Sequence, residues 1–394
     1  MRLRLASLFL AGAVAPGALL AAGPPVQPKT GPGGADYVSG DVTKRAIGTA
    51  SSASFAFYQG APAPEPRRVV VMLHAWGAVN PQAYGGMIDH LARKGYLVLW
   101  PRFQELGKTR PADATANAAT LVKEAFAALA DDANARPDAN RVVLVGHSAG
   151  AGIAANLAAV AKAEGLPVPK AVVGLMPGGV ASDAKSRGIV LSDLAQIDPA
   201  TILITMSPDR ENAAADRTGR RILKEASSVP AERKLFMRAL SDTHGFPVLS
   251  ATLASPGASN DAYDAAKITI PPDPKGDPRA ERMRRQKWSA DMVLTGEQTV
   301  LVQQLSNNGT DTLDWLGYWK TIELAAAGAF AGKDAQALRT DPAFADMGSW
   351  SDGWPVKRLV AETPRPETAA QAAKAAAAAK PATPAPKAPT TRRR

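Results

Sequence analysis

Short apolar runs alternate along the chain with longer segments of helical period. Most of the runs are rich in Val, Ile and Leu without a polar alternation, which is expected of strands buried on both faces of a sheet. Two weaker runs, Tyr37–Ala46 and Ser54–Gln59, predict an antiparallel start to that sheet. The six stronger predicted strands are Arg68–Leu73, Tyr96–Trp100, Arg141–Val145, Ala171–Met176, Thr201–Met206 and Lys234–Leu240.

Helical patterns fill the gaps between these runs. Gln82–Lys94 ends in basic residues followed by Gly95, a common helix stop. Further helices are predicted over Ala114–Ala130, Ala149–Glu164 and Thr312–Ala331. Strands alternating with helices predict an α/β fold with a mostly parallel central sheet of about eight strands and helices on both faces.

One long stretch breaks this alternation. Pro247–Asn308 is rich in proline and charge and has little period, so it is expected to be an insertion in a single domain covering 24–362. The interval between the predicted strands Ala171–Met176 and Thr201–Met206, about Pro177 to Pro199, is too short for a large cap there. We therefore expect the insertion to shape or cover a cleft, and its deletion to alter substrate preference before it alters the chemistry.

The two ends of the chain differ from this domain. In residues 1–23, two arginines precede an apolar run that closes on small residues, which is typical of a secretory signal peptide whose last residue is Ala22 or Gly23. A retained N-terminal anchor is the alternative. With no cysteine in the chain, neither a lipoprotein anchor nor disulfides are available. A secreted or periplasmic protein is expected, with no transmembrane span after cleavage.

From Thr363 to Arg394 the chain is dominated by Ala, Pro and Lys and is expected to be a disordered tail. Eight of the ten excess positive charges lie in residues 1–23 and 363–394. The domain between them is close to neutral, so it offers no electrostatic footprint for nucleic acid. The basic tail can contact an anionic surface, although such tails are more often solvated linkers.

The candidate chemistry begins where a predicted strand runs into Gly146-His147-Ser148-Ala149-Gly150 and then a helix. G-x-S-x-G alone is a weak signal, but this context is that of a nucleophile elbow, a sharp turn that lifts a serine hydroxyl above the sheet edge. The helix start also places a backbone N–H and the positive end of its dipole near a developing oxyanion. A plain glycine-rich turn is the structural alternative.

From this elbow outward, roughly over Arg68–Ala331, the chain resembles the α/β-hydrolase superfamily. That family orders its triad as nucleophile, acid, histidine, which implies Ser148 as nucleophile. Asp209, after the strand Thr201–Met206, is implied as the acid, with Asp183 and Asp198 as the other candidates. Of the four histidines, His244 lies beyond the last predicted strand, where the family places its base. Asp242 is too close to His244 in sequence to orient it.

The resemblance also implies the oxyanion hole. One donor is the backbone N–H of Ala149, and the other comes from the loop His74-Ala75-Trp76-Gly77, in which Trp76 takes the donor position. Many relatives have glycine where this chain has Ala75, so a required positive φ there would strain the loop. The run from Leu73 to Gln104 looks most like the dienelactone hydrolase, chlorophyllase and platelet-activating-factor acetylhydrolase branch.

These residues predict a serine hydrolase that cleaves a small-molecule or lipid-like carboxylic ester through an acyl-enzyme. No cofactor is implied, since four scattered histidines without cysteine make no metal cluster and no glycine-rich phosphate loop occurs. A peptidase or amidase would use the same triad. A catalytically silent α/β-hydrolase acting as a binding module, with the tail as its contact, is the third interpretation.

Overall fold

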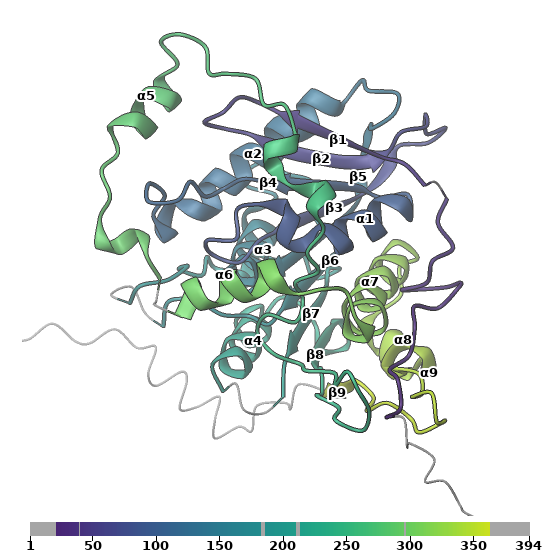
Figure 1. The fold of residues 1–394 in the computed structure, drawn as a ribbon. Helices are drawn as coiled ribbons and strands as arrows, with labels where there is room; N and C mark the ends of the chain where they lie inside the picture. Colours follow the sequence, from purple (N-terminus) through teal and green to yellow (C-terminus); the bar gives the residue numbers. More distant parts are fainter. Residues whose placement is uncertain (1–20, 39, 183–185, 210–212, 295–296, 363–394) are drawn as a thin grey trace, which may run out of the picture.

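A computed structural model describes residues 21–38, 40–182, 186–209, 213–294 and 297–362. The expected signal peptide, up to residue 20, and the expected tail from Thr363 lie outside the described residues. Within the described part, nine strands form one mixed sheet, one more than the eight or so predicted (Figure 1). The predicted α/β fold is confirmed.

The sheet has the order β1-β2-β4-β3-β5-β6-β7-β8-β9. Every pair from β4 to β8 is parallel, whereas β1, β2 and β9 pair antiparallel with their neighbours. The antiparallel start predicted from the weaker runs is therefore present. The bounds are β1 Val42–Ile47, β2 Ser54–Gln59, β3 Arg67–Leu73, β4 Leu97–Pro101, β5 Pro137–His147, β6 Ala171–Leu175, β7 Ile202–Ser207, β8 Lys234–Arg238 and β9 Val360–Glu362.

Side chains of the central strands alternate between two hydrophobic cores. In β3, Val70 and Met72 point into one core, while Val69, Val71 and Leu73 point into the other. The absence of polar alternation in the sequence thus reflects burial on both faces. The first core is covered by α1 (Gly85–Arg93) and α7 (Lys320–Phe330), and the second by α2 (Ala114–Leu129), α3 (Ala149–Val160) and α4 (Ala213–Glu225).

The predicted helix Thr312–Ala331 is present but begins irregularly. Leu313–Trp319 forms a π-helix, η8, that continues directly into α7. Two short helices, α8 (Ala335–Thr340) and α9 (Pro342–Ala345), follow before the chain returns to the sheet as β9. None of the helices in the described ranges combines the length and the apolar character that crossing a bilayer requires.

The stretch predicted as an insertion contains two helices, α5 (Pro278–Arg285) and α6 (Glu297–Asn307), joined by irregular segments. Figure 1 shows α5 standing out at one side and α6 crossing the front of the domain. Tyr263, Leu301 and Leu305 are almost fully buried and belong to the first core. The insertion is therefore part of the hydrophobic interior rather than an appendage on it.

One buried ion-pair group fixes the edge of the sheet next to the end of β7. Arg238 at the end of β8 donates to both carboxylate oxygens of Asp216 at 2.7 and 2.8 Å, and to Glu362 of β9 at 3.2 Å. Its side chain is 5% exposed. Because Arg238 also donates to the carbonyl of Pro208, it links β8, β9 and the loop after β7.

We predict that Arg238→Ala lowers the free energy of unfolding by about 3 kcal/mol, because it leaves the partly buried Asp216 carboxylate without its cation and removes one of the two arginines paired with Glu362. Arg45→Ala, which breaks an ion pair whose arginine is 43% exposed, should cost less than about 1 kcal/mol. Urea unfolding of both variants tests this, and equal losses would contradict the role given to Arg238.

Candidate active site

The strand-to-helix turn at Ser148 has the geometry of a nucleophile elbow. β5 ends at His147, α3 begins at Ala149, and Ser148 between them has φ 52° and ψ −115°. An L-residue with positive φ is strained by the contact of its Cβ with the backbone, and such strain is concentrated at functional sites. The Ser148 N–H donates to the carbonyl of Leu175 at 3.0 Å, which ties the turn to β6.

The two glycines of the motif are required by packing. A Cβ on Gly146 would lie 2.1 Å from the carbonyl oxygen of Gly150, and a Cβ on Gly150 would lie 1.9 Å from that of Leu73. Both distances are far below any contact that real side chains make. The elbow is therefore pressed against the end of β3, where the loop with Trp76 begins.

Two of the backbone donors in that loop are engaged. Ala75 N–H donates to the Tyr84 hydroxyl at 3.2 Å and Gly77 N–H to the Gln104 side chain at 2.7 Å. Among the described residues, no hydrogen bond engages the N–H of Trp76, and none engages that of Ala149 at the first position of α3. Both predicted oxyanion donors are thus unpaired among the described residues.

The possible strain at Ala75 does not arise. In the described residues, positive φ outside glycine occurs at Ser148 and Met176 alone, and in the loop it falls on Gly77, at φ 90°. The left-handed residue of this turn is Gly77, which occupies the second glycine position of the His-Gly-x-Gly pattern, whereas Ala75 occupies the first. Alanine at position 75 is therefore compatible with the loop.

The insertion covers the elbow. Trp76 donates from its indole nitrogen to the carbonyl of Met292 at 3.1 Å. A Cβ on Gly179 would lie 2.8 Å from Leu294 Cδ1 and 3.1 Å from the Ala149 side chain, so Leu294 packs above the start of α3. Ser148 is accordingly only 3% exposed. These contacts place residues of the predicted insertion over the elbow.

His147, next to the nucleophile, is locked by a complete set of hydrogen bonds. The Tyr84 hydroxyl accepts from Ala75 N–H and donates to His147 Nδ1 at 2.6 Å, and Nε2 donates to the carbonyl of Leu253 at 2.8 Å. Burial lowers the pKa of His147 to about 4, so the ring is neutral near pH 7. Sequence reasoning missed Tyr84, and no local signal marks it, because its partners are 9 and 63 residues away.

Asp209 and His244 lie where the order of strands places them, but they do not contact each other. Asp209 follows β7 and accepts the N–H of Ser241 at 3.0 and 2.9 Å. His244 follows β8, yet its Nε2 is 2.7 Å from Asp352 Oδ2, and its ring stacks on Trp354 at 5.4 Å. No hydrogen bond of the described residues joins His244 to Ser148 or Asp209. The three predicted triad members are therefore at one edge of the sheet but not assembled.

The other candidate acids are differently placed. Asp198 precedes β7, at the sheet edge opposite to Ser148, and pairs with Lys162 at 2.9 Å. Asp183 lies outside the described residues. Asp242 accepts from Trp350, from Lys357 and from the backbone of His244, and these bonds outweigh its burial and lower its pKa. It is engaged as a structural carboxylate of its own loop.

Asp352 is the residue that sequence reasoning did not consider. It lies in Trp350-Ser351-Asp352-Gly353-Trp354, and the hydrogen bond from His244 lowers its pKa. The two tryptophans of this turn could have marked it in the sequence as a candidate contact surface. No sequence pattern indicates that Asp352 pairs with a histidine 108 residues away.

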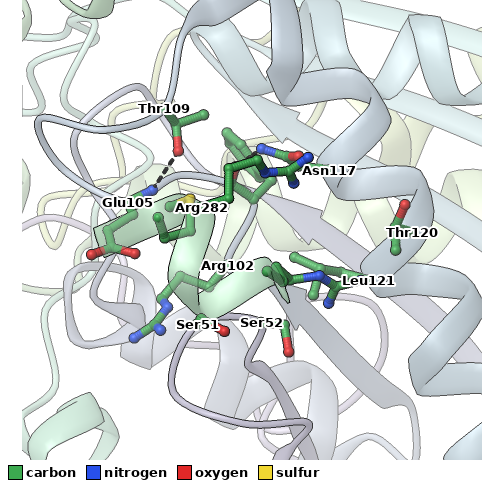
Figure 2. A pocket seen from close by; sticks show the side chains of 12 residues that line it. Ser51, Ser52, Arg102, Glu105, Thr109, Asn117, Thr120, Leu121 and Arg282 are labelled. Atoms are coloured by element: carbon green, nitrogen blue, oxygen red, sulfur yellow. Dashed lines mark hydrogen bonds between the residues drawn. The ribbon is translucent and has the colours of Figure 1, made fainter. Parts of the chain in front are cut away.

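Two hollows lie elsewhere on the described surface. The one in Figure 2 has about 100 Å³ and is lined by residues of the loop after β4, of α2 and of α5, among them Arg102, Asn117 and Arg282. A larger one, of about 440 Å³, is lined by Pro247–Leu249, Thr252, Ser255 and Asp311, with Pro24 from the N-terminal segment. Ser148 lines neither of them. Within the described ranges, no group of three or more His, Asp or Glu is placed to hold a metal.

These features define the class: the chain has the α/β-hydrolase fold. Residues 108–218, which contain the elbow, match a family model described as "alpha/beta hydrolase fold". None of the curated proteins matches the sequence.

Several solved structures are similar over about half of the chain. An esterase of Rhizomucor miehei is 15% identical, covering 52% of this chain and 76% of its own, with a TM-score of 0.39. Carboxyl esterase 2 of Tuber melanosporum is 14% identical, covering 52% and 79%, also at 0.39. A hyperthermophilic esterase of Pyrobaculum calidifontis is 15% identical, covering 54% and 77%, at 0.41. At these scores the assignment of the fold rests on the strand order and the elbow.

We predict that Gly150→Ala lowers the free energy of unfolding by about 3 kcal/mol, because the new methyl group would displace the backbone at the end of β3. Gly317→Ala is the matched control, since its Cβ would meet only Met347 Cε at 3.8 Å. Thermal or urea unfolding measures both. A stable Gly150→Ala protein would show that the elbow is not packed as described.

Proposed function

We propose that the protein is a carboxylic ester hydrolase in which Ser148 forms an acyl-enzyme. The observation that carries this proposal is the strained serine between β5 and α3, with the first N–H of α3 unpaired beside it. A strained, well-supported residue at the C-terminal edge of a parallel sheet is where such folds place their chemistry. The substrate class that fits the proposal is a small-molecule or lipid-like ester.

The proposed chemistry assigns each group one role. Ser148 Oγ attacks the ester carbonyl while the His244 imidazole takes its proton, and Asp209 holds that imidazole in the correct tautomer. The N–H groups of Ala149 and Trp76 stabilise the oxyanion, each by about 3–4 kcal/mol. His244 then protonates the departing alkoxide, and water attacks the acyl-enzyme with the same residues in reverse. No cofactor takes part.

The remaining histidines support His244 as the base. Burial lowers the pKa of both His74 and His147 to about 4, so these rings are poor proton acceptors near neutrality. His90 is buried under α7 and hydrogen-bonded to Glu323 at 2.6 Å. His244 alone, with its side chain 31% exposed, is an accessible imidazole near the elbow's edge of the sheet.

A second candidate is a catalytically silent α/β-hydrolase that serves as a binding module. The observation that His244 contacts Asp352 and not Ser148 favours this second candidate. The two candidates differ in whether Ser148 is activated, which a covalent probe detects directly.

We predict that a fluorophosphonate probe labels the protein, that Ser148→Ala abolishes labelling, and that Asp209→Asn slows it by roughly 10⁴-fold, because the imidazole loses its correct tautomer. Asp198→Asn, at the opposite sheet edge, is the control and should label at the wild-type rate. Absence of labelling in a folded wild type would favour the binding module. Comparing p-nitrophenyl esters with matched anilides then separates an esterase from a peptidase or amidase.

The covering segment is proposed to set substrate preference. Because Leu301 and Leu305 are core residues, deletion of the whole insertion would expose the interior, and a point variant is the sharper test. Leu294→Ala should raise the rate on long-acyl relative to short-acyl esters by roughly 10-fold, since it opens space above the elbow. The neighbouring Val293→Ala, 39% exposed, should leave the ratio unchanged. An unchanged ratio for Leu294→Ala would contradict the proposal.

The ends of the chain carry two further proposals. The leader-like residues 1–23 support export, with the mature protein secreted or periplasmic. The basic tail from Thr363 supports contact with an anionic surface.

Within the superfamily, the run Leu73–Gln104 supports the dienelactone hydrolase, chlorophyllase and platelet-activating-factor acetylhydrolase branch.

A further inference from the structure

The loop that carries His244 is fastened to the Trp-rich turn near the end of the domain. His244 Nε2 binds Asp352 at 2.7 Å, and its ring stacks on Trp354 with only 13° between the planes. Trp350, which is 2% exposed, donates from its indole nitrogen to Asp242 at 3.3 Å. The imidazole is thus held at the surface, on a partner that is not the proposed acid.

The leader junction fastens both sides of this contact. The carbonyl oxygen of Ala22 accepts the N–H of Phe246 at 2.8 Å. The same oxygen packs against Gly245, where an added Cβ would lie only 2.0 Å from it. Gly23 exchanges two hydrogen bonds with Ser351, each of 2.9 Å. Ala22 and Gly23 therefore bridge the His244 loop and the turn that holds Asp352.

We propose that the leader junction keeps His244 in a resting position on Asp352, and that removal of the leader releases it toward Asp209 and Ser148. This rests on the proposed function and on the proposed export. The leader acts as an internal inhibitor, so that the hydrolase becomes active only after processing.

The processing step is hydrolysis of one amide bond by a signal peptidase. Water adds across the bond between Ala22 and Gly23: Ala22 leaves with the leader as a carboxylate, and the nitrogen of Gly23 becomes an ammonium group. If the cut falls one residue later, Gly23 leaves as well. Either cut removes the carbonyl oxygen that accepts the Phe246 N–H and packs on Gly245.

Cleavage before Gly23 also changes the charge beside Asp352. The new ammonium forms on an atom that lies 2.9 Å from Ser351 Oγ, one residue from Asp352. A cation there attracts the Asp352 carboxylate and competes with the imidazole for it. Asp352 is 48% exposed, so it can turn without unpacking the core.

The released imidazole has a short way to travel. Ser241, three residues before His244, already donates its N–H to the Asp209 carboxylate. Three residues span at most about 10 Å, so rearrangement of the segment 242–248 suffices to bring the ring to Asp209. That carboxylate has further lone pairs to accept the imidazole N–H.

The direct test compares two folded proteins made without export, one starting at Met1 with the leader intact and one starting at Gly23. The rate of fluorophosphonate labelling at Ser148 is measured for each. A charge-assisted contact biases an equilibrium by roughly 10- to 100-fold, so the Gly23 protein should label at least about 10-fold faster. Equal rates would overturn the resting position, whereas labelling of neither protein would refute the hydrolase itself.

A variant pair shows which carboxylate serves which role. Asp352→Asn in the Met1 protein should raise labelling toward the rate of the Gly23 protein, because the neutral amide holds the imidazole less strongly. Asp209→Asn should lower labelling in both proteins. If Asp352→Asn instead lowers labelling in both, Asp352 is the acid that orients His244, and the proposal is wrong.

Discussion

The positive φ of Ser148 is the constraint on which the site depends. With only Ser148 between β5 and α3, the chain can make this turn because Ser148 adopts a positive φ and residues 146 and 150 lack side chains. The same turn brings the first N–H of α3 beside Ser148 and presses the elbow against β3. The loop with Trp76 thereby lies next to it. The proposed nucleophile and the proposed oxyanion donors thus follow from one local geometry.

The position of His244, the proposed base, depends on contacts that are remote in sequence. His244 is held by the turn at 350–354, and that turn is hydrogen-bonded to Gly23. The elbow at Ser148 and the loop that carries His244 are therefore stabilised in different ways. The first is stabilised by the sheet, whereas the second is held by a few polar contacts near the surface, so its conformation responds to changes at the chain's N-terminal segment.

The cover over Ser148 belongs to the same core as the sheet. Leu301 and Leu305 anchor α6 in the first hydrophobic core, while Met292 and Leu294 reach over the elbow. Since burial of these anchors stabilises the whole domain, the cover is held in place by folding itself. Access to Ser148, which is 3% exposed, is therefore a property of the packed domain.

The sequence by itself determined the alternation of strands and helices, the parallel centre and the elbow. Each of these depends on periodicity or on a motif within a few residues, where steric rules act directly. It did not reveal β9, which has only three residues, or the irregular start of the helix after Thr312. Nor did it reveal that His244 pairs with Asp352. Only the tertiary structure decided these, because they arise from contacts between segments far apart in the chain, for which no local pattern carries information.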